Sequence, residues 1–204
     1  MKYCSTELQA ELKRRPYRLK RRAEGAEETR RRIVQATAEL HIEQGIAATT
    51  MKQIAERAGV GVGTVYHHFP TLDDTILACG RMVTETHPPP GEAIFAGVGP
   101  LRERLTRLAH AVFGHRDAMM YDRVRHDLES NPAVRHFAAE EEDNRIELTR
   151  AALAPFAVDR NLIRVVAALL DISVYRGLQR AGLPLKDAAG AIADIVHARV
   201  TRKD

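Results

Sequence analysis

Three glycines at alternating positions, in the segment "AGVGVGTVYHHF" (58–69), narrow the possible folds of this chain more than any other feature. Such a run forms either a loop that holds a phosphate group or a tight turn between two helices. A dinucleotide-binding loop needs the spacing GxGxxG after a strand, whereas this run has GxGxG after a helical segment. A Walker-type loop needs Gly-Lys followed by Ser or Thr, and this region has no such triplet. The helical interpretation is therefore favoured.

Each glycine has a place in two short helices joined by a turn. Thr50 is a suitable N-cap for the helix "MKQIAERA", and Gly59 follows as a left-handed residue that ends it. Gly61 begins a second helix over about 62–68. Gly63 lies inside that helix and costs it about 1 kcal/mol relative to alanine, which indicates close approach to another molecule. The pair matches a helix-turn-helix, whose second helix enters the major groove of DNA.

The apolar pattern predicts an all-α protein of about nine helices. The small core of the motif is expected from Ile54, Ala55, Ala58, Val60, Val65 and Phe69. Further helices are predicted over about 26–44 (apolar or small at Ile33, Ala36, Leu40 and Ile42), 71–84 (with a Thr71–Asp74 capping box), from Leu101 onward, and over 115–129, 133–155, 160–180 and 185–200. The segment "THPPPGEAIFAGVGP" (86–100) is predicted to be a linker. These boundaries give a flexible basic arm (1–22), a DNA-binding head (23–85) and a helical body (86–204).

The positive charge of the chain is concentrated near its N-terminus. The net charge is +4, yet residues 1–32 alone hold 11 Lys or Arg and 5 acidic residues. The densest part is "KRRPYRLKRR" (13–22), which is attracted to polyanions but, taken alone, is more typical of a solvated, disordered tail. Beside a helix-turn-helix we favour contact of this arm with DNA. Its candidate residues are Arg14, Arg15, Arg18, Arg21 and Arg22.

The segment "TTMKQIAERAGVGVGTVYHHFPTLDDTIL" (49–77) resembles the helix-turn-helix signature of the TetR family of bacterial transcriptional regulators. The resemblance extends from about Thr29 to Leu77, and the other two thirds are similar to the family only in the number, length and order of helices. It implies a three-helix DNA-binding head followed by a helical ligand-binding and dimerisation body. It also implies a homodimeric repressor that a small-molecule inducer releases from a palindromic operator in double-stranded DNA.

The resemblance further implies which residues contact DNA. Thr50 would offer its hydroxyl or amide to a phosphate, and Lys52 would reach a base or a phosphate. Val62 and Gly63 lie where the family reads bases. Because valine has no hydrogen-bonding group, direct readout by hydrogen bonds rests on Lys52, Tyr66 or the arm. The full candidate set is Thr50, Lys52, Gly61, Val62, Gly63, Thr64, Tyr66, His67 and His68.

Three positions differ from the family pattern or have two possible roles. Leu72 stands where the family often has Lys or Arg, so a phosphate contact is lost there, and the basic arm would offset it. His41 stands where the family's lead-in helix commonly has an aromatic residue, which leaves the packing there open. His68 is as compatible with a structural role as with a phosphate contact.

In this family the last two long helices of two subunits pair as a four-helix bundle, while the middle helices enclose an effector. Ordinary core packing is the alternative for both sets of residues. Candidate dimer residues are Leu162, Val166, Leu169, Gly177, Ile192, Ile195 and Val196. Candidates for a largely apolar pocket are Leu105, Leu108, Phe113, Met119, Met120, Tyr121, Phe137, Leu169 and Tyr175.

Other classes of function have less support from the residues. A helical enzyme that uses His with Asp or Glu needs clustered side chains. Four histidines in the middle of the body lack the i,i+4 spacing of metal-binding pairs: His110, His115, His126 and His136. We therefore expect no enzymatic activity, no cofactor and no metal, and we keep a non-specific architectural DNA-binding protein as the alternative. Two distant cysteines fit a reduced cytosol, and no apolar run approaches the length of a membrane span. The resemblance implies a bacterial cytoplasmic protein that is bound to the nucleoid through DNA.

Overall fold

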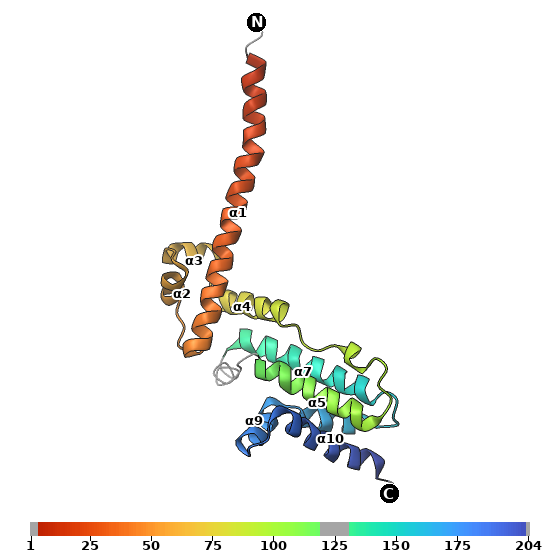
Figure 1. Cartoon of the computed structure of the whole chain (residues 1–204). Coiled ribbons are helices and arrows are strands. Elements are labelled where there is room, and N and C mark those ends of the chain that lie inside the picture. Colours follow the sequence, from red (N-terminus) through yellow and green to blue (C-terminus); the bar gives the residue numbers. More distant parts are fainter. Residues whose placement is uncertain (1–3, 119–130, 203–204) are drawn as a thin grey trace. The chain divides into compact units, whose positions relative to one another are not determined.

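The computed structural model describes residues 4–118 and 131–202 (Figure 1). In these residues every regular element is helical, which confirms the predicted all-α class. The nine described α-helices are α1 (Cys4–Gln44), α2 (Met51–Ala58), α3 (Val62–His68), α4 (Leu72–Thr86), α5 (Leu101–Ala118), α7 (Pro132–Leu153), α8 (Arg160–Leu169), α9 (Ile172–Arg180) and α10 (Leu185–Thr201), and a 3-10 helix, η1 (Glu92–Phe95), precedes α5. Across the described ranges, no helix has the length and apolar character that a bilayer crossing requires.

Contacts within the chain separate two compact units, residues 1–79 and residues 80–204. The first unit holds α1 to α3 and the first half of α4, and the second holds the helices that follow. The helix expected over 115–129 falls mostly outside the described residues. Its first positions, 115–118, belong to α5. Three residues of the predicted pocket and one histidine of the body lie there too: Met119, Met120, Tyr121 and His126.

Helix α1 provides the apolar face on which the first unit is built. Ile33, Ala36 and Leu40 are buried, as their spacing predicts. Ile42, the other apolar residue noted in this helix, is not part of the buried face, since its side chain is 49% exposed. Two residues beyond Leu40 correspond to about 200° around the helix, so Ile42 faces away from the buried stripe. His41, next to Leu40, is buried instead and fills the position expected for an aromatic side chain.

The structure continues α1 through the basic arm. Helix α1 begins at Cys4, well before the start near residue 26 that the apolar pattern predicts. Arg21 and Arg22 are exposed. The side chains of Arg14, Arg15 and Arg18 lie outside the described set. Flexibility of the arm and its contact with DNA stay predictions.

The second unit has a continuous apolar core formed mainly by α5, α7, α9 and α10. At its centre the rings of Phe113 and Tyr175 are stacked with centroids 4.7 Å apart. The predicted linker contributes to this core as well, because Phe95 and Val98 are buried in the structure. The segment 86–100 is therefore partly packed against the body.

The prediction of one long helix over 160–180 was wrong, because the structure has two helices there, α8 and α9. Asp171 separates them and acts as the N-cap of α9, accepting a hydrogen bond from the Ser173 amide at 2.8 Å. Aspartate is a favoured N-cap because its carboxylate satisfies an amide that lacks a helical partner. The run of apolar residues on both sides conceals this break in the sequence.

Candidate DNA-binding surface

The turn between α2 and α3 has the geometry expected from its glycines. Gly59 adopts φ +64°, and its amide donates to the carbonyl of Glu56 at 3.2 Å. The Val60 amide donates to the carbonyl of Ala55 at 3.0 Å. These two bonds form a Schellman motif, which a left-handed glycine favours at a helix end. Gly61 then serves as N-cap of α3, and its carbonyl accepts from the Thr64 amide at 2.9 Å.

The side chains of α3 divide into a buried anchor and an outward face. Val65 is fully buried and fixes the helix against the core of the first unit, as does Phe69 just beyond its end. Val62, Gly63, Tyr66 and His67 are exposed, and Thr64 and His68 are half-buried. The predicted core residues Ile54, Ala55 and Ala58 are buried and Val60 is half-buried, which confirms the predicted motif core. A rigidly held helix thus presents most of the predicted DNA-contacting residues to solvent.

Gly63 has open space beside it. A Cβ atom built at this position meets nothing within 4 Å, so the protein itself does not require glycine there. The φ angle of Gly63 is not positive, so its backbone conformation does not require glycine either. Without a side chain at this position, the backbone of α3 is open to close approach by another molecule.

Thr50 and Lys52 lie at the start of α2. Thr50 and Gln53 form a capping box, in which the Gln53 amide donates to the Thr50 hydroxyl at 3.3 Å and the Thr50 amide donates to Gln53 Oε1 at 2.9 Å. Lys52 is exposed, with its Nζ 3.9 Å from a carboxylate oxygen of Glu56. Such an exposed pair is weak, so Lys52 is available to an external anion. Leu72, half-buried as the first residue of α4, offers no such group.

We expect Thr50→Ala to lower the free energy of unfolding by about 1 kcal/mol, because the Gln53 amide loses its side-chain acceptor. Thr50→Ser, which keeps the hydroxyl, should retain most of that stability. Urea denaturation followed by circular dichroism measures both. Equal stability of the alanine and serine variants would show that the capping box contributes nothing.

The sequence did not reveal which basic residues hold the motif in place. Arg32 on α1 donates to the carbonyls of Ala58 and Gly59, the latter at 3.1 Å, and so satisfies the carboxyl end of α2. Arg30 lies over the Phe69 ring, with its guanidinium carbon 4.7 Å from the centroid. Two of the N-terminal positive charges therefore have structural partners.

Helix α2 is also tied to α1 by an ion-pair network. Arg57 donates to Glu43 Oε2 at 2.7 Å and to Glu39 Oε2 at 3.3 Å. The hydrogen bond from Arg57 lowers the pKa of Glu43 below its usual value. These contacts join residues 14 and 18 positions apart, which no local pattern in the sequence indicates.

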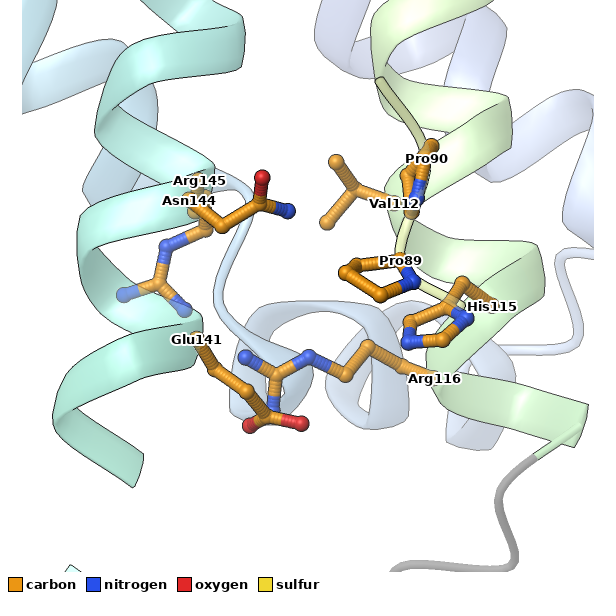
Figure 2. Close-up of a pocket in the computed structure, with 8 residues that line it drawn as sticks. All are labelled: Pro89, Pro90, Val112, His115, Arg116, Glu141, Asn144 and Arg145. Carbon is orange, nitrogen blue, oxygen red and sulfur yellow. The ribbon is translucent and has the colours of Figure 1, made fainter. Parts of the chain in front are cut away.

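The predicted pocket residues in the body are mostly core. Leu105, Leu108, Phe113 and Tyr175 are buried in the continuous apolar core. Phe137 and Leu169 are half-buried. A hollow does exist in this unit, but its lining differs from the predicted set (Figure 2): Pro89, Pro90, Val112, His115, Arg116, Glu141, Asn144 and Arg145.

The predicted dimer residues fall into buried, half-buried and exposed groups. Val166, Ile192 and Val196 are buried inside the subunit, so they do not form a surface for a second copy. Leu162, Leu169 and Gly177 are half-buried. Ile195 is 59% exposed, and so is Val165 at 55%, which was not in the predicted set. In residues 4–118 and 131–202 no group of three or more metal-ligating side chains is found.

The comparisons with known proteins point to the same segment. The family model for "Bacterial regulatory proteins, tetR family" matches residues 33–79. The HTH-type transcriptional regulator TtgR of Pseudomonas putida is 38% identical over 69 residues, which are 34% of this chain and 33% of TtgR. HbdR of Aromatoleum sp. (strain CIB) is 34% identical over 89 residues, which are 44% of this chain and 38% of HbdR. The chain thus spans about a third of the length of these relatives.

Solved structures extend the likeness to the body. The multidrug binding protein EbrR in complex with imidazole has a TM-score of 0.60 and 21% identity, covering 85% of this chain and 90% of that structure. A transcriptional regulator from Saccharomonospora viridis in complex with choline, described as putative, has a TM-score of 0.60 and 20% identity, covering 87% and 100%. At such identities the likeness shows a shared fold.

The capped turn, the buried anchor and the outward face of α3 define a helix-turn-helix protein. The match to residues 33–79 identifies this segment as a helix-turn-helix of the kind found in the TetR family of bacterial regulatory proteins.

Proposed function

We propose that this chain is a sequence-specific DNA-binding transcriptional regulator, a homodimeric repressor that a small molecule releases from a palindromic operator. The observation that carries the proposal is the outward face of α3, where Tyr66 is 51% exposed while Val65 is completely buried. A helix held in this way can enter the major groove without rearrangement. Gly63 lets the DNA approach the helix backbone. Lys52 and Tyr66 supply the hydrogen-bonding groups for base readout.

Dimerisation supplies the two-fold symmetry that a palindrome requires. Val165 and Ile195 are large apolar side chains left exposed on α8 and α10, the region from which the interface was predicted. Exposed apolar groups of this size mark an interaction surface when they are contiguous. We propose that α8 and α10 of two copies bury them.

Ligand control is supported by the fold. The structures that share it include EbrR bound to imidazole, ethidium and malachite green, and the Saccharomonospora viridis regulator bound to choline. Those molecules are ligands of those proteins. For this chain we propose only that the body binds a small organic effector and that the regulator acts in the cytoplasm.

Fluorescence anisotropy with DNA fragments that flank the gene tests the proposal. We expect one palindromic fragment to bind at least about a thousandfold more tightly than random DNA at physiological salt. Analytical ultracentrifugation should show a dimer of the 204-residue chain. Equal affinity for random DNA would contradict specific recognition and favour the architectural alternative. Deletion of residues 1–22 separates the two further, because it abolishes architectural binding but only weakens a specific regulator.

A further inference from the structure

The hollow in the second unit is lined by apolar side chains and by polar side chains of α5 and α7 (Figure 2). Pro89 and Pro90 cross one side of it, and Val112 on α5 extends the apolar surface. Figure 2 shows the side-chain amide of Asn144 extending from α7 toward Val112. The empty space is about 280 Å³, including the part open to solvent.

The two arginines of the hollow differ in how well they are satisfied. Arg116 on α5 reaches across to α7, where its Nη1 lies 2.6 Å from Glu141 Oε2. Arg145 is 91% buried, since only 9% of its surface is exposed, and its contact with Asp171 Oδ2 is long, at 3.4 Å. Its Nε has no hydrogen-bond partner. The other oxygen of Asp171 is engaged by Ser173.

A buried guanidinium N–H group without an acceptor is energetically unfavourable. Arginine has five N–H donors, and each donor buried without a partner costs free energy. Burial lowers the pKa of Arg145, and the nearby Arg116 lowers it further, although Asp171, Glu142 and Glu141 oppose the shift. The Nε–H of Arg145 has no acceptor among the described residues, and an acceptor from outside the chain would supply one.

We propose that this hollow binds the carboxylate group of a small organic acid, with Arg145 as its principal donor and Asn144 as a second donor. Pro89, Pro90 and Val112 contact the short apolar body of the acid. Arginine suits this role because its planar fork matches both oxygens of a carboxylate. The second guanidinium, Arg116, disfavours a cation at the same place. The proposal gives the effector of the regulator a chemical class, and in that respect it rests on the proposed function.

Thermal unfolding of the DNA-free, full-length protein tests the binding. The probes are acetate, isobutyrate, benzoate and salicylate, each compared with its uncharged amide. We expect at least one acid to raise the Tm by about 5 °C at one hundred times its Kd, and its amide to have little effect. Arg145→Met should weaken binding of that acid at least about tenfold. Arg145→Lys keeps the charge without the fork and should give an intermediate loss.

Arg150→Gln is the matched control, because Arg150 is an exposed arginine on the same helix. It should bind the acid as tightly as the unchanged protein. If no acid exceeds its amide, or if the Arg145 variants bind as tightly as the control, the proposal is wrong. Since no DNA is present, this outcome is independent of whether the chain recognises an operator. Failure of operator binding with retained acid binding would contradict the proposed function alone.

Discussion

Gly63→Leu is expected to reduce the affinity for the operator at least about a hundredfold while leaving the protein folded and slightly more stable. A leucine side chain at this position enters open space, because an added Cβ meets nothing within 4 Å. Leucine also favours the helix by about 0.8 kcal/mol over glycine. On DNA the same side chain would occupy the space that the double helix needs. Stability and binding should therefore change in opposite directions.

Anisotropy and thermal unfolding on the same preparation check this expectation. Gly25→Leu is the matched control, because Gly25 is also an exposed helical glycine with nothing within 4 Å of an added Cβ. It lies outside the predicted arm and outside the predicted DNA-binding set. Unchanged operator binding by Gly63→Leu would show that α3 does not approach DNA at this residue.

Arg104→Met is expected to lower the free energy of unfolding of the body by about 3–5 kcal/mol. Arg104 is buried on α5 and donates to four carbonyls, those of Phe95, Val98, Ala151 and Ala152. Its guanidinium carbon also lies 4.8 Å from the centre of the Phe95 ring. Methionine fills a similar volume but leaves these carbonyls buried without a donor. The loss is a large share of the stability of a typical domain.

Thermal unfolding should show this as a decrease in Tm of roughly 10 °C. Arg107→Met provides the control, because Arg107 is on the same helix and its side chain is 49% exposed in a pair with Glu103. An exposed pair of this kind contributes roughly 0.5 kcal/mol. A Tm for Arg104→Met close to that of Arg107→Met would mean that the four carbonyl contacts are not stabilising.

Structural features that depend on residues close together in the chain could be predicted from the sequence. The Thr50 cap, the left-handed Gly59 and the Thr71–Asp74 capping box are all present as predicted. The apolar spacing also identified Val65 and Phe69 as buried anchors of the motif. These features depend on hydrogen bonds and helix periodicity within a few residues. Local sequence therefore determined the helix-turn-helix and its outward face.

Contacts between distant residues were decided by the tertiary structure. Arg32 satisfies the end of α2 from 26 positions away, and Arg104 reaches Ala152 from 48 positions away. An arginine in the sequence gives no sign of whether it will meet a carbonyl, a carboxylate or solvent.

Helix packing decided which apolar residues are exposed and where the hollow forms. Apolar periodicity shows that α8 and α10 have buried faces but not what covers them, so it could not separate the buried Val166 and Val196 from the exposed Val165 and Ile195. The hollow around Arg145 combines residues 89–145, and only packing of α5 against α7 brings them together. Sequence alone thus determined the helix-turn-helix and the helix that faces outward from it. The surfaces available to a second copy and to a ligand depend on which faces the helices bury against one another.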